Sequence, residues 1–214
     1  MAISKANFNS FNVTPTASKF ITFNSSNNGL AADDVGGNLK LISTQTASSS
    51  STLSFTSGID STYKEYIFKI INVHPASAQY FQFQASTDGG SNYNTTITST
   101  AFDAYHFESG SATGLRYGSS GDLAESTSFQ SLYYVTPNTD NDASASGFLH
   151  LFDPSNTTFV KQFFSTMSIM TDNPAADNYF TGGKFNTTSA INAVQFKLAS
   201  GNIGSGVIKL YGVS

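Results

Sequence analysis

The chain contains no cysteine and no tryptophan, and few of its 214 residues carry a charge. Without cysteine it can form no disulfide, no thiolate nucleophile and no cysteine-based zinc site. Charged residues make up 11% of the sequence, against ~25% in an average soluble protein. Ser, Thr, Asn and Gln supply the polar side chains instead. Such a neutral surface suits stacking against neighbouring subunits, binding of neutral sugars, or the ordinary exterior of a β-sandwich.

Positive charge and long apolar runs are also scarce. The ten Lys and Arg are scattered along the chain and the net charge is −4, so we expect no nucleic-acid binding. No apolar run approaches the ~20 residues of a transmembrane helix, so we expect no membrane insertion. Residues Met1–Phe11 lack the continuous apolar core of a signal peptide. Hydrophobic residues still make up 39%, with 19 Phe and 10 Tyr, which is enough for a core without disulfides.

Residues 1–37 differ in character from the rest of the chain. Isolated aromatic residues stand among Ser, Asn and Thr: Phe8, Phe11, Phe20 and Phe23. We expect an extended N-terminal arm with one strand at Lys19–Phe23, followed by a single domain over residues 38–214. The arm could attach to a neighbouring subunit or fold back onto the domain.

From residue 38 onward the sequence alternates between apolar and polar residues with a period of two, which is typical of half-buried strands. Phe81, Phe83 and Ala85 alternate with Gln82 and Gln84, for example. We expect strands over Leu39–Thr44, Thr52–Thr56, Glu65–Val73, Tyr80–Ser86, Tyr93–Ser99, Phe129–Val135, Gly147–Phe152, Phe159–Met170, Tyr179–Phe185, Ala193–Leu198 and Gly206–Tyr211. This pattern predicts an all-β fold: a two-sheet antiparallel β-sandwich, and more specifically a jelly roll.

Three local features complete the predicted fold. Asp88-Gly89-Gly90-Ser91 favours a turn, so we expect a hairpin that returns through Tyr93–Ser99. Asp122–Thr127 is the best helical candidate, because Asp122 could cap one or two turns. The strand that begins at Phe159 is long enough for a bulge near Ser165.

A search for catalytic residues gives only weak candidates. His74 precedes Pro75 at a strand end, and His106 lies between aromatic neighbours. His150 shares a strand face with Phe148 and Phe152, and we expect it to be a hydrogen-bonded structural residue among core aromatics. A triad of His150, Asp153 and a distant serine is conceivable, but the sequence contains no G-x-S-x-G elbow. We therefore predict no catalytic residues and no enzyme activity.

Carboxylates give no stronger signal. A glycosidase needs two of them facing a sugar, whereas turn chemistry explains most of the acidic positions here, namely Asp60, Asp88, Asp140, Asp142, Asp172 and Asp177. Asp140-Asn141-Asp142 could bind calcium, but it lacks the rest of an EF-hand loop, and a polar loop is the favoured interpretation. Asn-x-Ser/Thr sequons begin at Asn12, Asn94, Asn156 and Asn186 and are expected by chance in this composition. We predict no cofactor and no metal.

Aromatic residues in polar loops could form a sugar-stacking site. The candidates are Tyr93, Tyr105, Tyr117 and Tyr179. Tyrosine also packs at sheet edges and subunit interfaces, so both roles remain open.

Several segments, taken in order, resemble a recurring module in virion proteins of marine tailed bacteriophages. They are Phe55–Tyr66, Phe102–His106, Gly147–Pro154 with Thr157–Lys161, Asn186–Ile191, and Ser200–Gly206 continuing to Tyr211-Gly212. Together they span the chain from about Gly37 to its end. The resemblance implies a structural or tail-fibre-like protein of the virion, and it supplies no catalytic residues. It also implies that the arm is the variable part that determines where the module attaches.

We therefore expect a non-enzymatic structural protein located in the virion of a tailed phage. A tail appendage or fibre-type component that contacts the host surface is the first hypothesis. A capsid decoration protein is the alternative, and a carbohydrate-binding module is the second alternative. The expected partners are other virion proteins and further copies of the chain, in a trimer by analogy with fibres. A host surface glycan is a further candidate partner, since multiple copies would raise avidity.

Overall fold

The computed structural model describes residues 19–23, 30–34, 38–133, 143–170 and 175–214. The chain divides into two compact units, Met1–Asn38 and Leu39–Ser214. In the first unit, β1 (Lys19–Phe23) pairs antiparallel with β2 (Leu30–Asp34), with Lys19 opposite Asp34 and Phe23 opposite Leu30. The predicted strand at Lys19–Phe23 is therefore present. Its partner was not predicted, because the sequence LAADD has neither alternation nor β-branched residues.

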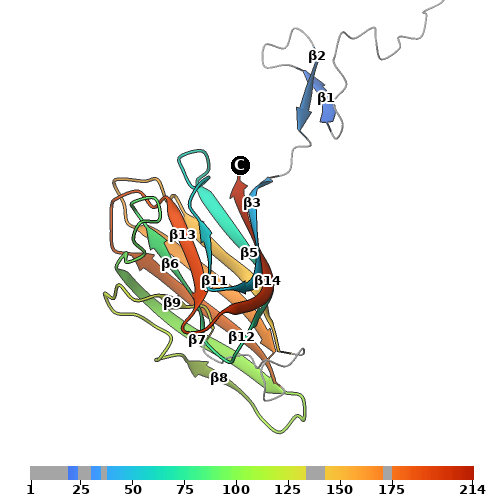
Figure 1. Ribbon diagram of the computed structural model, residues 1–214, viewed down its shortest axis with the longest axis vertical. Coiled ribbons are helices and arrows are strands. Elements are labelled where there is room, and N and C mark those ends of the chain that lie inside the picture. Colours follow the sequence, from blue (N-terminus) through green and yellow to red (C-terminus); the bar gives the residue numbers. More distant parts are fainter. Residues whose placement is uncertain (1–18, 24–29, 35–37, 134–142, 171–174) are drawn as a thin grey trace, which may run out of the picture. The chain divides into compact units, whose positions relative to one another are not determined.

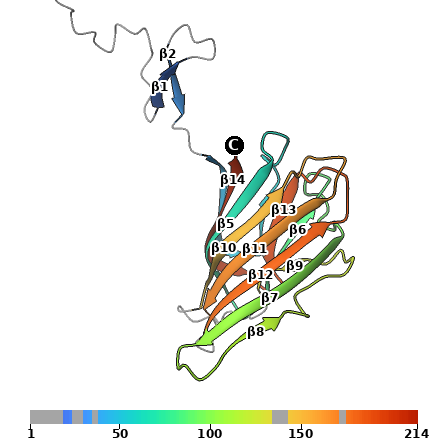
Figure 2. The same cartoon turned by 180° about the vertical axis from the view of Figure 1, so that it is seen from behind.

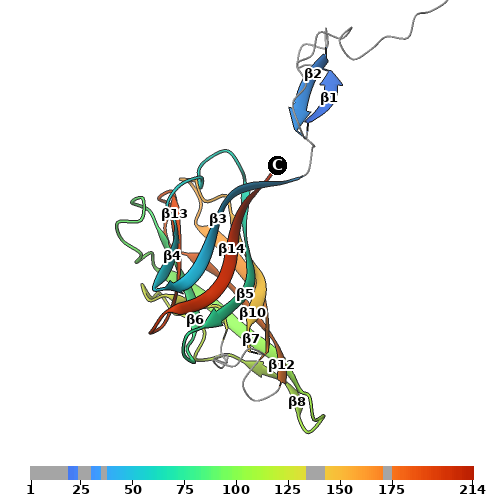
Figure 3. The ribbon, with the colours of Figure 1, turned by 45° about the vertical axis from the view of Figure 1, so that its right-hand side comes forward.

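The second unit consists of two antiparallel sheets packed face to face (Figures 1 and 3). The larger sheet has eight strands in the order β3 (Leu39–Ser50), β14 (Ile203–Val213), β5 (Glu65–Pro75), β10 (Ala145–Phe152), β11 (Lys161–Met170), β12 (Ala175–Phe185), β7 (Ile97–Phe107) and β8 (Thr113–Tyr117). The smaller sheet has four strands in the order β4 (Thr52–Phe55), β13 (Ala193–Leu198), β6 (Phe81–Ser86) and β9 (Gln130–Ser131). The predicted all-β antiparallel sandwich is confirmed.

Eight of these strands pair in a nested order. β3 pairs with β14 and β4 with β13, and inside them β5 pairs with β10 and β6 with β9. The remaining four strands, β11, β12, β7 and β8, continue the larger sheet beyond β10, where they lie side by side in Figure 2. The larger sheet therefore has twice as many strands as the smaller one.

The core between the sheets is dominated by phenylalanine. Phe196 of β13 is fully buried, and its ring centre lies 5.3 Å from that of Phe68 on the opposite sheet. It also lies 6.1 Å from Phe55 and 5.8 Å from Phe81. The alternation seen in the sequence places these rings inward, because successive side chains of a strand point to opposite faces. Phe196 therefore packs against aromatic rings of both sheets.

The hairpin predicted across Asp88–Ser91 is wrong. The turn itself forms, with Gly89 and Gly90 at positive φ and Asp88 accepting hydrogen bonds from Asn92. However, β6 lies in the smaller sheet and β7 in the larger one, so the two strands do not pair. Turn residues favour reversal of the chain, but they do not determine which sheet the next strand joins.

The helix predicted at Asp122–Thr127 is also wrong. Ser126 exchanges backbone hydrogen bonds with Ile97, and the backbone N–H of Leu123 donates to the Ser99 hydroxyl. Glu125 has a positive φ of 47°, which an α-helix excludes. The segment runs beside β7 because its backbone groups find partners there rather than within a helical turn.

Two other details differ from the sequence prediction. The pairing of β11 with both neighbours runs without a register shift, so there is no bulge at Ser165. The segment predicted as a strand at Phe129–Val135 contributes only the two-residue β9, and its last two residues lie outside the described part of the chain. The edge strand β8 was not predicted; it has only five residues, and most of them are exposed.

Two adjacent glycines of β12 give a first testable prediction. A Cβ on Gly183 would lie 2.6 Å from the backbone oxygen of Thr98 and 2.8 Å from the Phe163 ring, so Gly183→Ala should lower the free energy of unfolding by about 1–2 kcal/mol. A Cβ on Gly182 would meet nothing within 4 Å, so Gly182→Ala should raise that free energy by about 0.5–1 kcal/mol. Urea denaturation of both variants checks this. Equal effects would show that the two faces of β12 are not as described.

Candidate functional site

The outer face of the larger sheet carries a band of aromatic side chains. Phe148, Phe164 and Phe102 expose 44%, 43% and 45% of their surface, and Tyr117 exposes 61%. They lie on β10, β11, β7 and β8, with Phe180 on β12 completing the series. We call this set, together with His150 and Phe152, the aromatic face. Exposed aromatic clusters of this kind mark binding surfaces more often than isolated exposed rings do.

Five of the seven rings of the aromatic face form two stacks. In the first, the His150 and Phe164 rings lie 4.4 Å apart and within 10° of parallel, and Phe152 stacks on Phe164 at 5.8 Å. In the second, Phe102 and Phe180 lie 4.9 Å apart and within 14° of parallel. Direct cross-strand pairing explains both stacks, because His150 is opposite Phe164 and Phe180 is opposite Phe102.

A depression of about 220 Å³ lies between the two stacks. Its aromatic lining comes from Phe164 on one side and from Phe102 and Phe180 on the other. Gly182 is also part of the lining, directly opposite Phe164 in the register of β11 and β12. Because Gly182 has no side chain, the space above it stays open.

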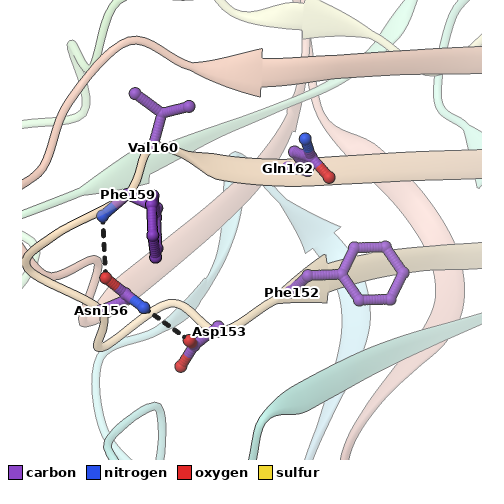
Figure 4. Close-up of a pocket in the computed structure, with 6 residues that line it drawn as sticks. All are labelled: Phe152, Asp153, Asn156, Phe159, Val160 and Gln162. Atoms are coloured by element: carbon purple, nitrogen blue, oxygen red, sulfur yellow. Dashed lines mark hydrogen bonds between the residues drawn. The ribbon is translucent and has the colours of Figure 1, made fainter.

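A second depression, of about 380 Å³, adjoins the first stack (Figure 4). It is lined by Phe152, Asp153, Asn156, Phe159, Val160 and Gln162. Most of its polar groups already have partners. Asn156 donates to Asp153 at 2.7 Å and accepts from the backbone N–H of Phe159 at 2.8 Å, while Asp153 pairs with Lys64 at 2.9 Å. These contacts shape the loop and leave the Phe159 ring, 70% exposed, at its surface.

The expectation that His150 lies among core aromatics is wrong. The side chains of Leu149 and Leu151 point into the core, while His150 faces outward beside Phe148. Its Nδ1 atom lies 2.6 Å from Oε1 of Glu65. Asp153 is held by Lys64 and Asn156 instead, so His150 and Asp153 do not form part of a triad. The sequence could not separate the two faces, because both carry apolar residues in this strand.

An acidic pair lies on the inner face of the larger sheet, on the neighbouring strands β7 and β12. Asp103 of β7 is 1% exposed and Asp177 of β12 is 2% exposed, which corrects the prediction that Asp177 lies in a turn. Arg116 of β8 donates from Nε to Asp103 at 2.9 Å and from Nη2 to Asp177 at 3.4 Å. Burial, with the neighbouring Asp103 carboxylate, raises the pKa of Asp177 to about 6. One guanidinium therefore serves two buried carboxylates at the edge of the sheet.

Lys161 is a further buried charge on the inner face. Its side chain is 1% exposed, and its Nζ atom donates to the backbone oxygen of Thr187 at 3.3 Å. Burial lowers the pKa of this lysine. A buried ammonium normally needs a carboxylate or several acceptors, so Lys161 combines an unfavourable environment with a single described acceptor.

The four tyrosines proposed for sugar stacking do not form one exposed site. Tyr179 is fully buried in β12, which contradicts its placement in a polar loop. Tyr105 packs under the Arg116 guanidinium at 4.3 Å, and Tyr93 is half-buried. Only Tyr117 belongs to the aromatic face, and its hydroxyl donates to Asp122. The exposed rings are chiefly phenylalanines within strands, including Phe148, which was expected among core aromatics.

The remaining candidates give no further site. The proposed calcium loop Asp140-Asn141-Asp142 lies outside the described residues. Within the described ranges, no group of three or more His, Asp or Glu side chains could hold a metal ion. No helix in that same part of the chain is long and apolar enough to cross a membrane.

Compared with protein-family models and with curated proteins, the chain matches none of them.

Proposed function

We propose that this chain is a non-enzymatic structural protein of a tailed phage virion, located in a tail appendage or fibre and contacting the host surface. The observation that carries the proposal is the aromatic face. A wide sheet holds it rigidly, because neighbouring strands fix the ring positions through direct pairing. A binding face on a rigid sheet suits attachment, since little ordering is required when a partner binds.

The resemblance to phage virion modules supports the same assignment. Two of the segments that carry it, Phe102–His106 and Gly147–Pro154, include Phe102, Phe148 and Phe152 of the aromatic face. A third, Thr157–Lys161, includes Phe159 of the second depression. Some of the segments that carry the resemblance therefore contribute to the surface proposed to bind.

The jelly-roll interpretation is part of this proposal. What supports it is the nested pairing of β3 with β14, β4 with β13, β5 with β10 and β6 with β9. Such nesting arises when one long antiparallel ribbon folds over into two sheets, as in the double Greek key of jelly rolls. Strands β7, β8, β11 and β12 are then additions that widen one sheet and support most of the aromatic face.

Immunogold electron microscopy of intact phage particles tests the proposal, with an antibody raised against this chain. We expect label on the tail tip or fibres. Label spread over the head would instead make the chain a capsid decoration protein. Particles with no label would overturn the virion assignment and leave the carbohydrate-binding module as the first hypothesis. The mass of the purified chain in solution tests the proposed trimer.

A further inference from the structure

We propose that the depression above Gly182 binds one neutral pyranose ring of a glycan chain. This inference names a ligand class for the host contact and rests on the proposed function for its biological setting. Binding by the isolated protein is nevertheless a separate measurement from the location of the chain on a particle.

The walls of the depression are aromatic ring faces. His150 covers the β10 side of the Phe164 ring, so the other face of that ring is turned toward β12. Phe102 covers the β7 side of Phe180, so the free face of Phe180 is turned toward β11. The C–H faces of a pyranose are apolar and pack against the electron-rich faces of aromatic rings. Two such faces on opposite sides of one space match the two faces of a sugar ring.

Size favours a single ring rather than a larger molecule. The volume of about 220 Å³ is below the ~300–1,000 Å³ of sites that hold drug-sized ligands. The floor is open because Gly182 carries no side chain, and no atom lies within 4 Å of the position where its Cβ would be. A larger residue at this position would fit the sheet and fill the space.

The chemistry of the lining favours a neutral ligand with an apolar face. None of the side chains that line the depression is charged, and its surface is almost entirely apolar although Thr100 and Thr166 are among the lining residues. A predominantly apolar lining is usual for small-molecule sites, and a pyranose can meet it with its C–H face while its hydroxyls stay in contact with water. Lys184 lies two residues beyond Gly182 on the same face but does not line the depression. The lining offers no partner to a carboxylate, so a neutral sugar is favoured over an acidic one.

The second depression extends the site. The Phe152 ring lines it, and that ring stacks at 5.8 Å on Phe164, which lines the first depression. A glycan of several residues can therefore contact both depressions along one face. Linked contacts raise the apparent affinity, so oligosaccharides should bind more tightly than the corresponding monosaccharide.

A glycan array probed with the full-length chain tests the inference, followed by calorimetric titration of the sugars retained. The array should contain neutral oligosaccharides of glucose, galactose, mannose and N-acetylglucosamine, together with acidic glycans that carry uronic or sialic acids. We expect binding to a neutral oligosaccharide and a loss of about tenfold or more in Gly182→Val, because the new side chain occupies the ring's place. A loss of this size corresponds to removal of one well-packed contact.

Ala176→Val is the matched control, since Ala176 is exposed on the same face of the same strand but outside the depression. It should leave the affinity unchanged. Thermal unfolding of both variants separates binding from folding, because Gly182→Val should not lower stability. Failure to retain any neutral sugar, equal binding by Gly182→Val, or binding only of acidic glycans through Lys184 would each overturn the inference. None of these results would change where the antibody labels the phage particle, so the two proposals can fail independently.

Discussion

Replacing Phe196 by alanine is expected to lower the free energy of unfolding by about 3–5 kcal/mol. The ring is fully buried and lies edge-on to Phe55 and Phe68 while it stacks on Phe81. Removal would leave a cavity between the two sheets, and the lost aromatic contacts add to the cost of the lost burial. Because the protein has no tryptophan, urea unfolding is best followed by far-ultraviolet circular dichroism and tyrosine fluorescence.

Phe164→Ala is the matched control for this prediction. Phe164 is 43% exposed on the outer face, so the same substitution should cost far less stability while it removes one wall of the depression. If both variants lost equal stability, the outer face would be covered by protein rather than exposed to solvent. That result would be informative in its own right, because an oligomer that covers the aromatic face would produce it.

Strand positions were the part of the fold that the sequence predicted best. In β5, a period of two puts Tyr66, Phe68 and Ile70 on one face, and all three are buried. In β13, the same period separates Val194 and Phe196 from Gln195, and the structure agrees. This success has a local cause, since a period of two depends only on side chains that alternate along one strand.

Contacts between distant segments were not predictable in the same way. The turn at Asp88 formed as expected, yet β6 and β7 joined different sheets. Asp177 was assigned to a turn from its residue type, whereas β12 places it inside beside Asp103 and Arg116. A buried ionised carboxylate is costly unless a cation or several hydrogen bonds offset the loss of hydration. Here that cation comes from β8, a strand that the sequence pattern did not reveal.

The candidate site was missed for a related reason. Phe148, Leu149, His150, Leu151 and Phe152 are apolar or aromatic on both faces, so alternation gave no signal for which face is buried. Phe148 and Phe152 were assigned to the core with His150, although much of a folded protein's surface is apolar. The adjacent pair Phe163 and Phe164 contained the available clue. Neighbouring residues of a strand point to opposite faces, so one of the two rings had to point away from the core.

The buried acidic pair has a consequence for stability that depends on pH. Asp177 has a pKa of about 6 in the folded protein and an ordinary pKa of ~3.9 in the unfolded chain. The folded state therefore holds this proton more tightly. The contribution of Asp177 is most favourable below about pH 4 and is lost as the pH rises through about 6. Ionised Asp177 thus lowers the stability of the protein at neutral pH.

Asp177→Asn should therefore stabilise the protein at pH 7–8 by about 1–3 kcal/mol and have almost no effect near pH 4. The upper value corresponds to a pKa difference of about two, and loss of the weaker Arg116 contact at 3.4 Å reduces it. Arg116 keeps Asp103 as its closer partner, at 2.9 Å from Nε. Urea denaturation of both proteins at several pH values between 4 and 8 provides the measurement.

Asp88→Asn offers a control of opposite sign. Hydrogen bonds from Ser86 and Asn92 lower the pKa of Asp88 to about 2, so its stabilising contribution is present above about pH 4 and is lost as the pH falls through about 2. This variant should be less stable than the parent at neutral pH, with a difference that shrinks in acid.

Parallel stability curves for Asp177→Asn and the parent between pH 4 and 8 would contradict the prediction, because they would mean that burial does not raise the pKa of Asp177. The Asp103–Arg116–Asp177 cluster would then be a balanced ion-pair network, in which the guanidinium fully offsets the cost of enclosing two carboxylates at the edge of the sheet.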